Sequence, residues 1–288
     1  MRLGHLMGRA EPLAVVAGDR VAPLGGRVEG IGSVDDVLAH WPDAREDLEA
    51  AAAAALRDDS VALEPGDLDV PLRRFAKVAC IGLNYADHIR ETGLETPTRP
   101  LIFAKFASSV VAASVPIRWA EGLTAQVDWE AELTVVIGRR MTDVGPEEAL
   151  EGVFGYTVAN DVSARDLQFA DVQWVRAKSI DTFCPLGPVV VTADEFGDPQ
   201  QKRILSRVNG KVMQDSSTSE MIFSTAEIIS FLSRSCTLEP GDLILTGTPW
   251  GVGAFRTPPV FLEAGDVVEV EVEGIGVLSN PVAGSAPA

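Results

Sequence analysis

The sequence predicts an α+β fold in which β-strands predominate. From residue 77 onward, short segments rich in β-branched residues are bounded by Gly, Pro or Asp, a pattern typical of strands joined by tight turns. Helical patterns are few and do not alternate regularly with the strands, which disfavours a doubly wound sheet or a (β/α)8 barrel. The expected strands are residues 78–83, 133–137, 155–159, 189–192, 243–246 and 267–272, and the expected helices are residues 86–92, 146–150 and 225–232.

The sequence predicts two domains: a small N-terminal α+β domain at residues 1–74 and a larger β-rich domain at residues 75–288. The texture of the chain changes near residue 75, where Pro and Gly residues precede the first of the regular strands. At the far end, we expect residues 284–288 to form a frayed tail. The N-terminal elements are expected at residues 13–17 and 27–31 for strands, after the N-cap Ser33 for one helix, and at residues 46–56 for an Ala-rich helix.

One short string recurs along the chain. Leu-Glu-Pro-Gly-Asp occurs at residues 63–67 and 238–242, and Leu-Glu-Ala-Gly-Asp at 262–266 is a variant. An internal repeat is one interpretation. A simpler one is a type II turn that leads into the next strand, because Pro favours the second turn position and Gly the third.

Charge and composition exclude several classes of protein. The chain has 24 Lys and Arg against 42 Asp and Glu, a net charge of −18, which argues against a nucleic-acid partner. A few local cations could still attract an anionic small molecule into a cleft. We expect no membrane partner, since no run of 18 apolar residues occurs. The N-terminus lacks the apolar stretch of a secretory signal, and Cys80, Cys184 and Cys236 form no CxxC pair, so a cytoplasmic protein is expected.

Three carboxylates predict a metal site. Glu130 and Glu132 flank one residue at the start of an expected strand, so their side chains point to the same face. Asp161 follows another expected strand directly. An oxygen-only cluster of this kind suits Mg²⁺ or Mn²⁺, whereas zinc would favour His or Cys ligands. The alternative for the two glutamates is an exposed polar face of an edge strand.

Five motifs follow one another in the larger domain. They are Gly-Leu-Asn-Tyr-Ala-Asp-His at 82–88, Glu-Ala-Glu at 130–132, Gly-Tyr-Thr-Val-Ala-Asn-Asp-Val-Ser-Ala-Arg-Asp at 155–166, Lys-Ser-Ile-Asp-Thr-Phe at 178–183 and Thr-Gly-Thr-Pro at 246–249. Together they resemble the fumarylacetoacetate hydrolase superfamily, and the short N-terminal unit is similar to its bacterial acylpyruvase-like branch. The resemblance implies mixed β-sheets that form a roll or barrel-like core, and a homodimer formed by this domain.

The resemblance also implies roles for individual residues. It assigns the metal to Glu130, Glu132 and Asp161, whose charges together with Mg²⁺ sum to −1, so cations must help to bind an anionic oxo acid. For this it offers Arg165, which can bind a carboxylate bidentately, and Lys178, which can donate a proton or stabilise an enolate. A surface salt bridge is the alternative for both. The remaining positions implied to contact substrate are Gln168, Gly247 and Thr248, while Lys105 also matches the family and is equally well explained by a structural role.

A histidine and a glutamate complete the expected site. His88 and Glu91 are three residues apart, on one face of the expected helix at 86–92. A carboxylate in this position can fix the tautomer of the imidazole and raise its basicity, which a water-activating base requires. The resemblance implies such a catalytic pair on a segment that acts as a lid. A purely structural histidine is the alternative.

These observations predict an enzyme that acts on a small anionic oxo acid. The preferred function is Mg²⁺- or Mn²⁺-dependent hydrolysis of the C3–C4 bond of an acylpyruvate or another 2,4-dioxo acid, through the enolate of pyruvate held by the metal. His88, oriented by Glu91, would activate water, and Lys178 would stabilise or protonate the enolate. The alternatives on the same site are decarboxylation of oxaloacetate and isomerisation of a 2-hydroxyhepta-2,4-diene-1,7-dioate. A non-catalytic protein that binds a metal or an oxo acid is the alternative of another class.

Overall fold

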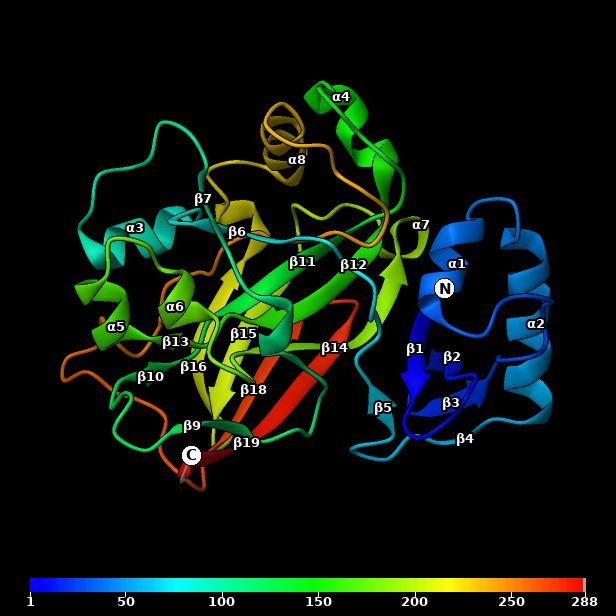
Figure 1. Ribbon diagram of the computed structural model, residues 1–288, viewed down its shortest axis with the longest axis horizontal. Coiled ribbons are helices and arrows are strands. Elements are labelled where there is room, and N and C mark those ends of the chain that lie inside the picture. Colours follow the sequence, from blue (N-terminus) through cyan, green and yellow to red (C-terminus); the bar gives the residue numbers. More distant parts are fainter. Residues whose placement is uncertain (287–288) are drawn as a thin grey trace.

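Two β-sheets of very different size organise the protein, a computed structural model that describes residues 1–286 (Figure 1). The strands of the main sheet are β1 (Arg2–Leu6), β2 (Leu13–Ala17), β3 (Arg20–Pro23), β4 (Val61–Ala62), β5 (Leu68–Asp69), β6 (Val78–Gly82), β7 (Leu101–Ala104), β8 (Val110–Val111), β11 (Ala131–Ile137), β12 (Val153–Asn160), β14 (Cys184–Thr192) and β17 (Leu243–Leu245). The second sheet consists of β9 (Ile117–Ala120), β15 (Arg203–Val208), β16 (Lys211–Ser217), β18 (Val267–Val272) and β19 (Gly276–Ala286), and β10 (Val127–Asp128) pairs only with β13 (Ser163–Ala164).

Both sheets are mixed and open. The main sheet runs in the order β4-β3-β2-β1-β14-β12-β11-β17-β6-β7, with β5 and β8 attached to β1 and β14. The second sheet runs β16-β15-β18-β19-β9. Most neighbours are antiparallel, but β6 and β17, β8 and β14, and β9 and β19 pair in parallel. The predicted mostly-β α+β fold is confirmed; within residues 1–286, however, neither sheet closes into the barrel-like core that the resemblance implied.

The core lies where the two sheets meet. Strands β11 and β12 of the main sheet contact β15 and β18 of the second. All seven residues of β11 are buried, and five of them are apolar, so this central strand is covered on both faces. Leu133 and Val135 of β11 belong to the same apolar cluster as Ile204 of β15 and Val270 of β18. This packing gives the ends of β11 and β12 a rigid support.

The helices cover the sheets and their edges. The N-terminal pair matches the predicted helices, and the side chain of Ser33 accepts a hydrogen bond from the backbone N–H of Asp36 at 3.1 Å, as expected of an N-cap. None of the described helices is long and apolar enough to cross a membrane. The helices are α1 (Val34–His40), α2 (Arg45–Asp58), α3 (Ala86–Thr92), α4 (Pro146–Ala149), α5 (Arg165–Ala170), α6 (Val175–Lys178), α7 (Ala193–Phe196) and α8 (Thr225–Ser233), with short 3₁₀ turns at Ala107–Ser109, Leu150–Gly152 and Thr218–Glu220.

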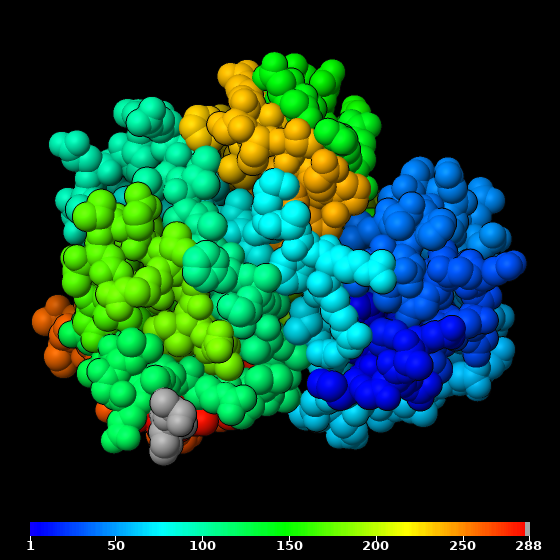
Figure 2. All heavy atoms as spheres, viewed as in Figure 1, coloured from blue at the N-terminus to red at the C-terminus, as the bar shows by residue number. Residues whose placement is uncertain are grey.

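The N-terminal residues form a lobe on one side of the molecule (Figure 2). Strand β1 nevertheless pairs with β14, with Leu3 opposite Val190, so the lobe extends the main sheet. The strand expected at 27–31 is wrong: only an isolated bridge joins Val28 and Ile31, because Gly30 between them has a φ of 75° and turns the chain. A division of the chain into domains at residue 75 stays a prediction.

The Leu-Glu-Pro-Gly-Asp strings form turns, as predicted. Their glycines, Gly66, Gly241 and Gly265, have φ values of 92°, 88° and 96°, which the third position of a type II turn requires. In each turn the backbone N–H of the aspartate donates to the carbonyl of the glutamate three residues earlier. Strands β5, β17 and β18 begin directly after the three turns. The strings are therefore local turn signals and do not mark a repeated domain.

The C-terminal residues differ from the expectation. Residues 284–286 continue β19, where Gly284 pairs with Arg118 of β9. The frayed tail predicted for 284–288 is therefore wrong for these three residues, because the edge strand β9 supplies their hydrogen-bond partners. Residues 287 and 288 lie outside the described part of the chain.

Candidate active site

The three expected metal ligands come together at one end of the β11–β12 pair. Glu132 lies in β11, Glu130 directly precedes it, and Asp161 directly follows β12. Because these strands are antiparallel, with Ala131 opposite Asn160, the start of one lies beside the end of the other. All three acids are buried, and one carboxylate oxygen from each lies within 4.8 Å of the others. Burial contradicts the alternative of an exposed edge-strand face.

Three buried cations surround these acids. The Nζ of Lys178 donates to Glu130 Oε2 at 2.7 Å and to Asp161 Oδ2 at 2.8 Å. The Nζ of Lys105 donates to Asp161 Oδ1 at 2.5 Å. The guanidinium of Arg165 forms an ion pair with Glu130, with 2.7 Å between Nη2 and Oε1. Arg165 and Lys178 are therefore not surface salt bridges, and Lys105 belongs to the same network.

The surroundings shift the pKa values of the two glutamates in opposite directions. Burial opposes ionisation of Glu130, but the charges of Lys178 and Arg165 outweigh it and lower the pKa of Glu130 to about 2. For Glu132, burial raises the pKa well above its usual range, and the negative charges of Asp161 and Glu130 raise it further. The site therefore stabilises the ionised form of Glu132 less than that of Glu130 when no cation is bound beside it.

The residues present fit a divalent cation. Ion pairs reach Glu130 and Asp161, but within residues 1–286 no Lys or Arg forms an ion pair with Glu132. The carboxylate of Glu132 accepts a hydrogen bond from the backbone N–H of Gly247 at 2.7 Å. A hard cation between the three acids would supply the positive charge that Glu132 otherwise lacks as a partner. Oxygen-only ligands suit Mg²⁺ or Mn²⁺.

His88 and Glu91 lie on one face of α3, which begins and ends as the sequence predicted. The ring Nδ1 of His88 is 3.0 Å from Glu91 Oε2. The other oxygen of Glu91 accepts from the backbone N–H of Gly251 at 2.9 Å, so the glutamate is held on both sides. A carboxylate at Nδ1 favours the tautomer with its proton there, which leaves Nε2 with a lone pair.

A small cavity unites most of the expected site residues. It has a volume of about 80 Å³, far below the few hundred Å³ of typical ligand pockets. Seven expected residues line it: His88, Glu130, Glu132, Arg165, Gln168, Lys178 and Thr248. The rest of its wall is mainly apolar and consists of Ile81, Gly82, Leu83, Leu94, Phe103, Phe169, Trp174 and Phe255.

The three other expected residues, Glu91, Asp161 and Gly247, do not line the cavity but form hydrogen bonds to residues that do. Glu91 holds His88, Asp161 holds Lys178, and Gly247 donates its N–H to Glu132. Gly247 has a φ of 100°, and a Cβ there would lie 2.8 Å from the Cβ of Asn84, so the close approach of this loop requires glycine. All ten expected residues thus belong to one site.

Helix α5 carries two of the residues expected to contact substrate, Arg165 and Gln168. Arg165 and Gln168 are one turn apart, and Arg165 Nη1 donates to Gln168 Oε1 at 2.8 Å. Arg165 also donates through Nε to Asp128 Oδ2 at 2.8 Å. Burial opposes its charge, but Asp128 and Glu130 raise the pKa of Arg165 above its usual range, so the guanidinium stays charged.

Sequence reasoning missed two parts of this site. Asp128 was not among the expected residues, although it precedes the Trp-Glu-Ala-Glu string directly. The aromatic side chains Phe103, Trp174 and Phe255 were also missed, because nothing in their local sequence distinguishes them from core residues. Counting Asp128 and Glu91, the site holds five acids and three Lys or Arg cations, so a divalent cation would bring its net charge to zero with His88 neutral. Such a site no longer repels an anionic substrate, and the cations Arg165 and Lys178 line the cavity itself.

Comparison with known proteins agrees with this geometry. Residues 77–283 match the family described as fumarylacetoacetate (FAA) hydrolase C-terminal. The chain is 51% identical over 214 residues to the mitochondrial oxaloacetate tautomerase fahd2 of Xenopus laevis, which covers 74% of this chain and 67% of the relative.

Solved structures extend the likeness to the whole chain. A fumarylacetoacetate hydrolase from Exiguobacterium antarcticum superimposes with a TM-score of 0.85 at 39% identity, covering 99% of both chains. A 2-hydroxyhepta-2,4-diene-1,7-dioate isomerase from Mycobacterium marinum superimposes with a TM-score of 0.74 at 36% identity, covering 99% of this chain and 98% of that one. The likeness therefore includes the N-terminal lobe.

Proposed function

This chain belongs to the fumarylacetoacetate hydrolase family, and we propose that it is a divalent-metal-dependent enzyme that enolises a small 2-oxo acid. The observation that carries the proposal is the cavity of about 80 Å³ that His88 lines together with Glu130, Glu132 and Lys178. The first candidate reaction is the keto–enol tautomerisation of oxaloacetate. Its support is the relative of that name, with 51% identity over 214 residues.

The charged residues of the cavity divide into two groups. Glu130, Glu132 and Asp161 would hold Mg²⁺ or Mn²⁺, which would supply Lewis acidity at the 2-oxo oxygen of the substrate. Arg165 and Gln168 would bind a carboxylate, because both residues line the cavity, the guanidinium stays charged, and its five N–H groups outnumber its three protein partners. These contacts would place the C3 carbon of the acid against the imidazole.

His88 would move the proton. Its Nε2 would accept a proton from C3, while Glu91 keeps the other ring proton on Nδ1 and stabilises the imidazolium. The protonated ring can then return the proton to C3 or deliver it to the 2-oxo oxygen, so one residue serves both directions of a tautomerisation. The ammonium of Lys178 lies in the same cavity and would stabilise the negative oxygen of the enolate.

Cleavage of an acylpyruvate is the second candidate function. The His88–Glu91 pair favours it, because the same Nε2 could take a proton from a water molecule that adds to the C4 carbonyl. The C3–C4 bond would then break, with pyruvate leaving as its enolate. Decarboxylation of oxaloacetate and isomerisation of a heptadienedioate share the enolate, and the Mycobacterium marinum structure supports the latter as an alternative.

A substrate panel separates these reactions. The wild-type protein is mixed with oxaloacetate, acetylpyruvate or 2-hydroxyhepta-2,4-diene-1,7-dioate, with Mg²⁺ or Mn²⁺ and with or without EDTA. Loss of the enol absorbance of oxaloacetate without pyruvate release identifies tautomerisation, whereas pyruvate release from oxaloacetate or acetylpyruvate identifies decarboxylation or hydrolysis. We expect metal-dependent loss of the enol absorbance. If the protein binds these acids with Mg²⁺ but converts none of them, it is a non-catalytic binding protein.

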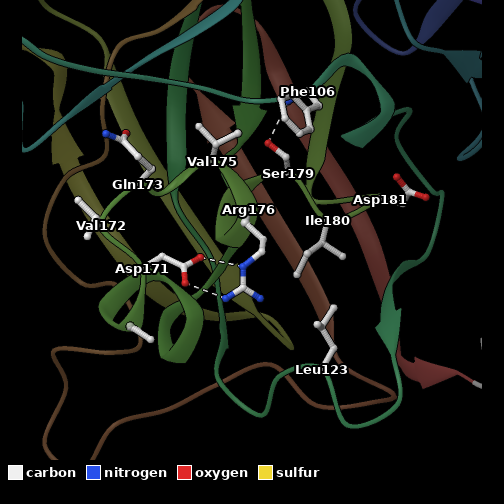
Figure 3. A pocket seen from close by; sticks show the side chains of 11 residues that line it. Phe106, Leu123, Asp171, Val172, Gln173, Val175, Arg176, Ser179, Ile180 and Asp181 are labelled. Atoms are coloured by element: carbon white, nitrogen blue, oxygen red, sulfur yellow. Dashed lines mark hydrogen bonds and ion pairs between the residues drawn. The ribbon is translucent and has the colours of Figure 1, made fainter.

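For assembly we propose a homodimer through the face around α5 and α6. This face holds an open hollow of about 920 Å³, lined by Phe106, Leu123, Val175 and Ile180 among others (Figure 3). The hollow is larger than the cavity of the candidate active site, and none of the three proposed metal ligands lines it. Val172 is 95% exposed and Phe106 60% exposed at its rim. Because the chain carries a charge of −18, only a charge-poor face permits contact between two copies.

Three charged residues line this hollow, Asp171, Arg176 and Asp181, and two of them pair with each other. Asp171 and Arg176 form a bidentate pair at 2.8 Å for both contacts, as Figure 3 shows. Analytical ultracentrifugation should therefore show a wild-type dimer and a monomeric Val172→Lys variant. Val61→Lys is the control, because Val61 is also exposed, at 59%, but lies in the N-terminal lobe. A monomeric wild-type protein at micromolar concentration, or a dimeric Val172→Lys variant, would contradict the proposal.

A further inference from the structure

We propose that Asp128 is a positioning residue that holds Arg165 and the loop at 253–255 in the arrangement that substrate binding requires. The inference rests on the proposed function, since it takes Arg165 as the group that binds a carboxylate. Asp128 itself does not line the cavity, so it would act through the residues that it holds.

Asp128 is fully buried, and its carboxylate accepts four hydrogen bonds. Oδ1 accepts from the backbone N–H of Trp129 at 2.8 Å and of Gly253 at 2.6 Å. Oδ2 accepts from Arg165 Nε at 2.8 Å and from the backbone N–H of Ala254 at 2.9 Å. Four donors saturate the two oxygens, so the carboxylate has one orientation and links segments that are far apart in the sequence.

The bond to Arg165 sets the direction of the guanidinium. A guanidinium has five N–H donors, and here Asp128, Gln168 and Glu130 each engage one nitrogen. Two N–H donors therefore remain for a substrate carboxylate. Without the carboxylate at Nε, the guanidinium would be drawn toward the acids of the metal site, and these two donors would turn away from the substrate.

The hydrogen bonds from Asp128 to the loop at 253–255 also affect His88, through Phe255. A Cβ on Gly253 would lie 1.9 Å from the carbonyl oxygen of Val260 and 2.8 Å from Asp128 Oδ1, so only glycine fits against the carboxylate. Two residues on, the ring of Phe255 contacts the ring of His88 edge-on, with 5.8 Å between centroids. One carboxylate thus fixes both the carboxylate-binding residue and the aromatic ring packed against the base.

Asp242 provides an internal comparison for a purely structural role. It is also buried, and it accepts from the backbone N–H groups of Lys77 and Glu239, at 2.9 and 2.8 Å, and from Lys77 Nζ at 2.7 Å. Glu239 belongs to the turn before β17 and Lys77 directly precedes β6, and neither lines the cavity. Substitution of Asp242 should therefore destabilise the fold without changing the site.

The test compares Asp128→Asn with Asp242→Asn in the Mg²⁺-loaded protein. Asparagine retains the volume but presents N–H donors to a group of donors, so both variants should lose stability. Calorimetric titration with oxalate, a stable dianion with the spacing of a 2-oxo acid, measures binding apart from turnover. We expect the Kd of oxalate to rise about 10- to 100-fold in Asp128→Asn, the usual effect of losing a charge-assisted hydrogen bond, and to change little in Asp242→Asn.

Kinetics and a double mutant sharpen the assignment. The KM for oxaloacetate should rise with the Kd of oxalate in Asp128→Asn, with a smaller change in kcat and an unchanged affinity for Mg²⁺. If Asp128 acts through Arg165, the double variant Asp128→Asn/Arg165→Gln should bind oxalate no more weakly than Arg165→Gln alone. Additive losses would mean that Asp128 does not act through Arg165.

Each remaining outcome also decides the inference. An unchanged Kd for oxalate in folded Asp128→Asn overturns it, as does an equal loss in Asp242→Asn. If Asp128→Asn does not fold, Asp128→Glu, which keeps the charge but displaces it by one methylene, must weaken oxalate binding for the inference to stand. A wild-type protein that binds oxalate but converts no oxo acid refutes the proposed function alone. A wild-type protein that does not bind oxalate refutes the role of Arg165, and with it that of Asp128.

Discussion

The two buried histidines of this chain differ in how their ring nitrogens are used. In the N-terminal lobe, the Nδ1 of His5 is 2.8 Å from the carbonyl of Val70, and Nε2 accepts from the backbone N–H of Val34 at 2.8 Å. Both nitrogens thus have protein partners that tie β1 to the start of α1. In the candidate site, Nδ1 of His88 meets Glu91, and the ring borders the cavity.

Buried acids show the same contrast. In the lobe, Asp35 accepts from the backbone N–H groups of Arg73 and Arg74, so its burial serves the fold. In the site, Glu132 is buried beside two other acids and forms no ion pair with a described Lys or Arg. Polar groups whose partners lie within the protein stabilise it, whereas buried groups that face a cavity with an incomplete set of partners indicate chemistry.

The largest effect should follow from removing the acid with the fewest partners. We expect Glu132→Ala to lose at least about a thousandfold in Mg²⁺ or Mn²⁺ affinity, because an oxygen-only site depends on each carboxylate. Isothermal titration calorimetry measures it. Asp35→Ala, in the lobe, is the control and should bind the metal as the wild type does. Equal metal binding by Glu132→Ala and the wild type would show that the acid cluster is not a metal site.

Replacing the histidine of the site should affect turnover alone. His88→Ala should lower kcat on the best substrate by about 10²- to 10⁴-fold, the usual range for loss of a general base. Metal affinity should survive, since no imidazole is among the proposed ligands. His40→Ala, on an exposed histidine in the lobe, is the matched control. Full turnover by His88→Ala would mean that another group is the base and would remove the contrast with His5.

Removing the partner of that histidine should have a milder effect. Glu91→Ala should lower kcat about 10-fold, because a misoriented imidazole keeps some basicity. The variant also loses the hydrogen bond to the N–H of Gly251, so its thermal unfolding should be followed alongside its kinetics. Glu91→Gln separates the two roles, because the amide can still accept from Gly251 but cannot stabilise an imidazolium. Equal kcat values for Glu91→Gln and the wild type would refute the catalytic pairing.

The histidine of the lobe should affect stability instead. His5→Ala leaves the N–H of Val34 and the carbonyl of Val70 without their partner, which costs about 1–3 kcal/mol for a buried group. Denaturant unfolding measures this loss. Turnover of the folded variant should equal that of the wild type, because no contact of His5 reaches the cavity. A loss of turnover at full folding would show that the two regions are coupled.

The smallest expected effect is a dependence of stability on pH. Burial lowers the pKa of His5 below its usual value of 6.5, and the hydrogen bond to Val70 offsets this only in part. The unfolded chain therefore binds this proton more readily than the folded one. The contribution of His5 is complete above about pH 6.5 and is lost as the pH falls toward the lowered pKa. Between pH 7.5 and 5, His5→Gln should lose less stability than the wild type; an equal loss would contradict this.

Elements with a strong local signal were predictable. Helix α3 and strands β2 and β18 have the predicted bounds, since each combines clear periodicity with a turn or cap at its ends. The β15–β16 hairpin was missed, although Asn209 and Gly210 between its strands have φ values of 52° and 76°, as a type I′ turn requires. Its strands contain many polar residues and therefore lack the apolar pattern by which the other strands were recognised.

By itself, the sequence determined which residue types could perform chemistry here: a pair of glutamates, a strand-end aspartate and a histidine followed by a carboxylate. Their motifs are local, and local spacing decides which side chains share a face. Only the tertiary structure decided that Lys105 and Asp128 belong to the same network, and that the aromatic residues close the cavity to about 80 Å³. Those contacts join segments far apart in the chain, and their partners depend on how β11, β12 and the loops pack, which no local pattern encodes.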